Sequence, residues 1–385
     1  MLAKNKTPFV AIGFEQVHRD GPPMAVISVR GCFSLYPDGK LELMPNPQLV
    51  LADEHDGHPH TTPLLRAGDL IPFKPFADVT ILANAHAPGG RPARDWTVEI
   101  AIEKTVNYAL RVHAARAWTW DRDGLLGSWR LRYVEKDAIE IPIDYRHAFG
   151  GAPAGDVNAR ATPDERNPIG RGPMAKGVSV KRDIDYPAAQ IENPKTPLKD
   201  PHQEFEPEGF GPIPVWWAWR GRYTGTCDDA WVKERAPYHP KDFDYRLYQV
   251  AHPKLIMRGY LHGDEEVQLR HLVRGVDLLK FRLPGMTPWV KYHWTDGRRV
   301  DARLNCDGLH IDLRNGPPWR VDLTWRGWVV ACPKFMKIDL FQGTIKETAG
   351  LPYSDENGLT EADEPALNTT SGGIDVISTR GQSRH

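Results

Sequence analysis

The stretch LHIDLRNGPPWRVDLTW, residues 309–325, decides the fold class. Apolar side chains alternate with polar ones at Leu309, Ile311 and Leu313, and the alternation resumes after the loop from position 319 onward. A period of two is typical of a strand with one buried face. Asn315-Gly316 between the halves is a hairpin signal, because both residues tolerate positive φ. We therefore predict two antiparallel strands joined by a hairpin whose loop is lengthened by the two prolines.

The same alternation recurs nearer the amino terminus. It is visible in WTVEIAIE (96–103), YALRVHA (108–114), WRLRY (129–133) and IEIPIDY (139–145), where Ile139 shares a face with Ile141. A register wrong by one residue would turn every one of these side chains to the opposite face. The side chains that we predict to be mostly buried are Trp96, Ile100, Leu110, Leu131, Ile141, Ile311, Leu313 and Val321.

These patterns predict a mainly β protein. We expect two antiparallel β-rich lobes, sandwich- or barrel-like, at residues 1–145 and 254–349. An irregular connector rich in Pro, Gly and Trp would join them at 146–253, and the polar residues 350–385 would form a flexible tail. The 34 glycines and 34 prolines interrupt helices, so helix content should fall below the average of about 30–35%. Short helices are predicted at 228–235 and 242–250, with Asp228 and Asp242 as N-caps.

Composition narrows the function classes. Lys and Arg total 49 against 50 Asp and Glu, a balance that argues against a nucleic-acid scaffold. The four cysteines form no CxxC pair, and neither a secretory signal nor a run of about 18 apolar residues is present. We expect a cytoplasmic protein without a cofactor.

The segment DEHDGHPH (53–60) offers a possible metal site. His55, His58 and His60 could ligate a transition metal if a loop brought them together. Their spacing is not a defined ligand pattern, and Gly57 and Pro59 favour a surface turn. The turn is the favoured interpretation, and metal binding stays open.

The segment VWWAWRGRYTGTCDDAW (215–231) allows three interpretations. Trp216, Trp217 and Trp219 could stack a ligand, line a catalytic loop around Cys227, or build a core. Nothing in the sequence positions a base beside Cys227, so the core interpretation is favoured. The acidic pairs 228/229, 242/244 and 264/265 leave open a carbohydrate-active hydrolase, or a glycan-binding module, that uses the Trp216–Trp219 surface.

A series of ordered blocks is the most specific feature of the chain. They are FKPFADVTILANAHAPGGRP (73–92), HAFGG (147–151), RNPIGRG (166–172), QIENP (190–194), EGFGPIPVWWAWR (208–220), GTCDDAW (225–231), PKDFDYRLYQVA (240–251) and YLHGDEEVQL (260–269). Over about residues 10–330 the chain resembles the bacterial domain-of-unknown-function family 2169, which occurs among type VI secretion genes. One departure is Cys227, where the family usually has Tyr.

The resemblance implies a cytoplasmic adaptor, or effector chaperone, rather than an enzyme. Such a protein would bind a type VI effector and help to load it onto the VgrG spike or its PAAR tip. No catalytic residue is attached to the family, so none is assigned here. The residues that belong to its signature and are predicted as possible partner contacts are Trp216, Trp217, Arg220, Asp228, Trp231, Asp242 and Asp244.

Overall fold

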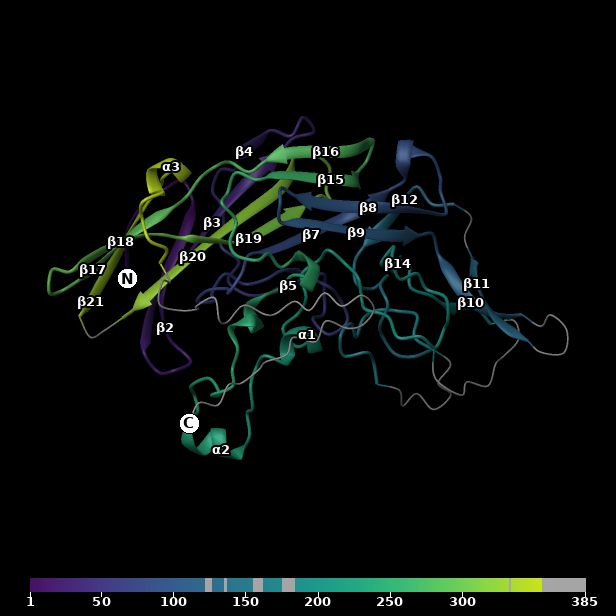
Figure 1. Ribbon diagram of the computed structural model, residues 1–385, viewed down its shortest axis with the longest axis horizontal. Helices are drawn as coiled ribbons and strands as arrows, with labels where there is room; N and C mark the ends of the chain where they lie inside the picture. The colour runs from purple at the N-terminus through teal and green to yellow at the C-terminus, as the bar shows by residue number, and fades with distance from the viewer. Residues whose placement is uncertain (122–126, 135–136, 155–161, 175–183, 332–333, 355–385) are drawn as a thin grey trace. The chain divides into compact units, whose positions relative to one another are not determined.

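The computed structural model describes residues 1–121, 127–134, 137–154, 162–174, 184–331 and 334–354 (Figure 1). Strands make up 44% and helices 7% of the described residues, which confirms the predicted mainly β class and its low helix content. Residues 1–354 form one compact unit. None of the helices in the described ranges is long and apolar enough to span a bilayer.

The largest sheet has seven strands. Its order is β12 (Glu140–Ile143), β7 (Asp78–His86), β19 (Asn305–Asp312), β20 (Trp319–Val330), β3 (Pro23–Leu35) and β2 (Val10–Val17), with β4 (Leu41–Leu43) also paired to β3. β19 and β20 are antiparallel across the loop at 313–318, as the Asn-Gly signal predicted. β19 pairs with β7 in parallel, which the sequence did not indicate.

A five-stranded sheet lies next in size. Its order is β14 (Ile191–Glu192), β9 (Val106–His113), β8 (Asp95–Ile102), β15 (Glu266–Val273) and β16 (Val276–Arg282). Trp96, Ile100 and Leu110 are buried in the same core cluster as Ile311 and Val321 of the seven-stranded sheet. The predicted register of alternation is therefore confirmed for both sheets.

The remaining predicted core positions are not all buried. Ile141 and Leu313 are buried as predicted, whereas Leu131 is half-buried. Ile139, which the alternation placed on the same face as Ile141, is instead 51% exposed. The reason is local, because β12 begins only at Glu140 and Ile139 precedes the alternating segment.

Three smaller sheets complete the unit. They are the four-stranded β1 (Leu2–Lys6), β21 (Phe335–Phe341), β17 (Trp289–Trp294) and β18 (Arg299–Arg303), the three-stranded β11 (Ser128–Tyr133), β10 (Arg116–Asp121) and β13 (Tyr186–Pro187), and the pair β5 (Glu54–His55) and β6 (Leu64–Arg66). No sheet closes into a barrel within the described ranges.

The predicted lobes at 1–145 and 254–349 do not form separate sheets. β20 pairs with β3, β15 with β8, and β21 with β1, so each of the three larger sheets combines strands from both ends of the sequence. Long-range pairing of this kind leaves no local sequence signal. Of the predicted flexible tail, Ser354 is buried and its hydroxyl lies 2.6 Å from the Tyr292 hydroxyl, while residues 355–385 lie outside the described ranges.

The helices are short. They are α1 (Ala218–Gly221), α2 (Asp229–Glu234), α3 (Ile345–Thr348) and the 3-10 helices η1 (Pro88–Gly90), η2 (Tyr245–Tyr248) and η3 (Pro253–Leu255). The Asp228 side chain accepts a bond from the Trp231 amide and caps α2, as predicted. Asp244 rather than Asp242 caps η2. Asp242 was wrongly assigned because its carboxylate accepts instead from the amide and hydroxyl of Thr226, at 2.9 and 2.7 Å.

Candidate functional site

The second face of the seven-stranded sheet is buried and charged. Strand alternation sends Val321 and Leu323 of β20 into the apolar core, and it sends Asp322, Thr324 and Arg326 to the opposite face. That face is covered by the loop at 44–77 and by part of the connector, so Asp322 and Arg326 are buried as well. Buried charges need partners.

Register aligns mostly polar residues in two rows across four adjacent strands. One row runs from Asp78 through Gly308 and Thr324 to Arg30. The next row runs through Thr80, His310, Asp322 and Cys32. These rows form one continuous polar floor.

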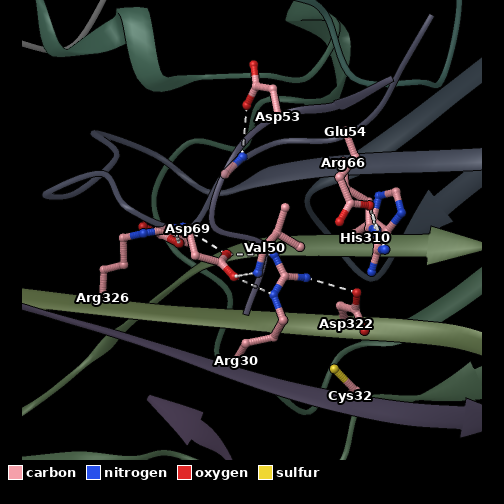
Figure 2. Close-up of polar contacts among 12 residues, drawn as sticks. Arg30, Cys32, Val50, Asp53, Glu54, Arg66, Asp69, His310, Asp322 and Arg326 are labelled. Atoms are coloured by element: carbon pink, nitrogen blue, oxygen red, sulfur yellow. Dashed lines mark hydrogen bonds and ion pairs between the residues drawn. The ribbon is translucent and has the colours of Figure 1, made fainter. Parts of the chain in front are cut away.

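Arg30 is the centre of this floor (Figure 2). Its Nη2 and Nε donate to the two carboxylate oxygens of Asp69 at 2.6 and 2.7 Å, and its Nη1 donates to Asp322 at 2.9 Å. Asp69 also accepts from the Val50 amide at 2.8 Å. The two-pronged Arg30–Asp69 pair fixes the loop at 44–77 against the sheet with defined geometry.

Two further ion pairs extend the network. Arg326 donates to Asp307 at 2.6 Å, and Lys74 donates to Asp78 at 2.9 Å. Asp78 also accepts from the Val250 amide at 2.6 Å, which ties the connector to β7. The charged face is therefore the contact through which loop and connector attach to the sheet.

The pKa values of these groups reflect burial and pairing. Burial alone would lower the pKa of Arg30 and raise that of Asp69, but their mutual attraction outweighs it and shifts both pKa values the other way. Burial raises the pKa of Asp307 despite the nearby Arg326. Burial also lowers the pKa of His310 to about 4, so this imidazole is neutral at pH 7.

A cavity of about 70 Å³ lies between the charged floor and its cover. β3, β7, β19 and β20 contribute the floor, Asp53, Arg66 and Gly68 come from the loop, and Arg220 and Tyr248 come from the connector. The volume accommodates several water molecules or one small ion, since one water needs about 10–15 Å³ on this scale. Five cationic side chains line it against three carboxylates.

The three clustered tryptophans do not share an exposed face. Trp217 is completely buried, with its ring edge-on to Tyr145 at 5.2 Å between centroids. Trp219 packs partly buried against the core beside His252, and Trp216 is 39% exposed. A sugar-stacking platform would need several accessible rings, and of these three tryptophans only Trp216 is exposed.

The remaining predicted site residues lie apart from one another. Arg220 is buried and lines the cavity. Asp228 caps α2 and half-buried Trp231 lies on it. Asp242 accepts a hydrogen bond from the Thr226 hydroxyl, and Asp244 forms an ion pair with Arg246. Of the predicted site residues, only Arg220 therefore lines the cavity.

The residues around α2 form a surface arm, which we define as residues 222–242. Val232 and Tyr238 on this arm are 58% and 49% exposed. The arm has internal bonds, including one from Trp231 Nε1 to the Tyr238 carbonyl at 2.8 Å. Gly225 adopts φ +77°, and a Cβ there would lie 2.8 Å from Asp242 Oδ1, so glycine fits this turn best.

The cysteines and histidines were the other candidates for a site. Cys227 is exposed, Cys32 and Cys306 are buried, and Cys332 lies outside the described ranges. The His58 carbonyl accepts bonds from the amides at 61 and 62, as in the predicted turn. Within the part of the chain that the structure describes, no three His, Cys, Asp or Glu side chains converge to hold a metal ion.

Sequence reasoning missed the charged floor altogether. Lys74 and Asp78 lie in the block FKPFADVT, but that block carried no chemical interpretation. The available signal was the polar set of β20, Asp322, Thr324 and Arg326, opposite the apolar one. This pattern identifies a polar face of the strand but does not show whether other residues cover that face.

Comparison with known proteins gives one match. Residues 20–326 match the family described as "Uncharacterized protein conserved in bacteria (DUF2169)". No curated protein and no solved structure matches the chain.

Proposed function

Because the chain belongs to the DUF2169 family, we propose that it is a non-enzymatic cytoplasmic adaptor of a type VI secretion system. It would bind an effector and help to load it onto the VgrG spike or PAAR tip. This role is the one implied by the family resemblance of the ordered sequence blocks. The structural observation that carries it is the surface arm at residues 222–242, which presents Val232 and Tyr238 to solvent.

The arm suits a protein partner for physical reasons. Its apolar side chains can be covered, and its internal bonds limit the entropy lost on binding. Asp228 and Asp229 lie beside Lys233 and Arg235, so the arm carries both signs of charge and would select by shape more than by steering. A stable interface needs about 1,200–2,000 Å² in total, so surface beyond the arm would join it.

The cellular test is deletion of the gene. Export of one cognate effector should stop while the secretion apparatus still fires, because an adaptor acts on one cargo. Purified protein should also retain that effector or its spike in a pull-down. Normal export of every effector, together with no retained effector or spike, would contradict the proposal.

The arm itself is tested by a charge substitution. The double variant Val232→Asp/Tyr238→Asp should lose the retained partner, because two carboxylates would be buried unpaired at the interface. Val134→Asp is the matched control, since Val134 is 51% exposed and lies outside the arm. Equal retention by both variants would place the contact on another surface.

A further inference from the structure

We propose that the cavity above the charged floor binds one small oxyanion, of the carboxylate or phosphate class, between Arg220 and Arg66. The site is independent of the adaptor proposal. It follows from one buried cation without a counter-ion, from free donors beside it, and from the space next to them.

Arg220 is the central residue. It is 7% exposed, and its Nε and Nη1 donate to the main-chain carbonyls of Leu247 and Ile213 at 2.9 and 2.7 Å. A guanidinium has five N–H donors, so others remain for a ligand. Burial lowers the pKa of Arg220 to about 10, which still leaves it charged at pH 7.

The other cations that line the cavity each have a carboxylate partner. Arg30 pairs with Asp69, Lys74 with Asp78, Arg326 with Asp307, and Arg66 with Glu54. Among the described residues, Arg220 has no carboxylate within ion-pairing distance. Asp53 and Asp78 act on it only through space. A buried charge without a direct partner is unfavourable, and an oxyanion in the cavity would supply that partner.

Additional donors and space lie on the floor. The buried Nε of Arg326 has no hydrogen-bond partner among the described residues. The buried Nε2 of His310 has none there either, and it is a donor in the tautomer whose Nδ1 accepts from the Thr80 hydroxyl, 2.9 Å away. Gly308 carries no side chain, and a Cβ there would contact only Thr324, at 3.4 Å. An anion can therefore approach the backbone of β19.

The mouth of the cavity carries opposing charges. Arg66 has a side chain that is 28% exposed and would reach an entering anion. Asp53 is exposed beside it and accepts from the Gly68 amide at 2.9 Å. Its charge acts on Arg220 through space and opposes anion entry. Replacing Asp53 should therefore favour binding, an effect that a purely structural role for the cavity does not produce.

The test is calorimetric titration of the full-length protein with inorganic phosphate, sulfate and acetate at constant ionic strength. We expect saturable binding of at least one of them at one site per chain. A short peptide with a free carboxyl terminus and its amide form a further pair of titrants. Binding of the acid form alone would identify a chain terminus as the source, whereas binding of the inorganic ions identifies a free anion.

Three variants locate the site. Arg66→Gln should weaken binding about tenfold, the loss expected for one charge-assisted hydrogen bond. Gly308→Ala should weaken it by filling the cavity, and Asp53→Asn should strengthen it. Arg314→Gln is the matched control, because Arg314 forms a similar ion pair with Asp312 but does not line the cavity. Thermal melts verify folding of each variant.

Two results would overturn the proposal. One is the absence of saturable binding by any of these titrants to the folded protein. The other is binding that Arg314→Gln weakens as much as Arg66→Gln does, or that Asp53→Asn leaves unchanged, because the anion would then be attracted by the surface in general.

Discussion

The two faces of the seven-stranded sheet are both buried, yet they are built on opposite principles. On one face Val321, Leu323 and Trp325 join the apolar core, where the stacked rings of Phe9 and Trp325 lie 5.1 Å apart. On the other face Arg30 pairs with Asp69 and Asp322, and Arg326 pairs with Asp307. Apolar burial is non-directional, whereas each buried charge needs a partner of defined geometry.

The difference determines how each face responds to substitution. An apolar side chain that is lost leaves a cavity, and its neighbours can relax toward it. A carboxylate that is lost leaves an arginine charged and buried, and no rearrangement of nearby apolar groups can compensate it. The charged face should therefore be the more sensitive of the two, and its residues should act on one another.

The largest effect is expected for Asp69→Asn. The variant removes the carboxylate that holds Arg30 and the Val50 amide, so the free energy of unfolding should fall by about 3–5 kcal/mol in urea denaturation. Combination with Arg30→Met should give less than the summed loss, since both substitutions break the same Arg30–Asp69 ion pair. Additive losses would mean that the pair is not coupled.

The apolar face should give a smaller loss with no such coupling. Leu323→Ala should lower the free energy of unfolding by about 3 kcal/mol, and the volume-conserving control Leu323→Met by less than about 1.5 kcal/mol. Leu323→Ala combined with Asp69→Asn tests whether the faces are independent. Strong non-additivity in that urea series would contradict the separation of the two faces.

Acid should weaken the charged face through His310. Its pKa is about 4 in the folded protein, below the ordinary value of 6.5, so the unfolded chain binds the proton first as pH falls. The stability is present above pH 6.5 and is lost as pH falls toward 4, by up to roughly 3 kcal/mol from this group. His310→Gln should flatten the pH dependence of urea unfolding in that window, and an unchanged slope would contradict the assignment.

The sequence predicted the apolar face and not the charged one, for a physical reason. Alternation identifies Ile311 and Val321 because adjacent residues in a strand point to opposite faces. The same pattern describes Asp322 and Arg326 equally well whether their face meets water or a covering loop. Arg30 and Asp69 come from a strand and an irregular loop, and Asp322 lies far from both in the sequence. The parallel pairing of β7 with β19 is equally long-range.

The prediction of the N-cap of α2 succeeded because it depends on a local contact. Asp228 was identified as a cap because the bond to the Trp231 amide spans three residues. Asp242 and Asp244 both fit a cap in sequence, and only the distant Thr226 decides between them. Burial of the tryptophans also depends on distant contacts, such as that of Trp217 with Tyr145.

The smallest effect is expected outside both faces, on the surface arm. The sequence predicts a loss of about 3–5 kcal/mol for Trp217→Ala and for Trp231→Ala if both rings are fully buried. Trp217 meets that condition, but Trp231 is half-buried on α2. We therefore expect Trp231→Ala to lower the free energy of unfolding by only about 1 kcal/mol, mainly through its bond to the Tyr238 carbonyl.

Paired measurements make this last comparison decisive. Urea denaturation should separate Trp217→Ala from Trp231→Ala by at least about 2 kcal/mol, given their different burial. Trp231→Ala should nevertheless reduce partner retention in the pull-down, because the ring supports Tyr238 on the arm. A loss of stability as large as that of Trp217→Ala would instead make the arm part of the cooperative core. The contribution of Trp231 to stability would then be enough to explain a tryptophan at this position. The proposal that the arm contacts a partner would lose its support.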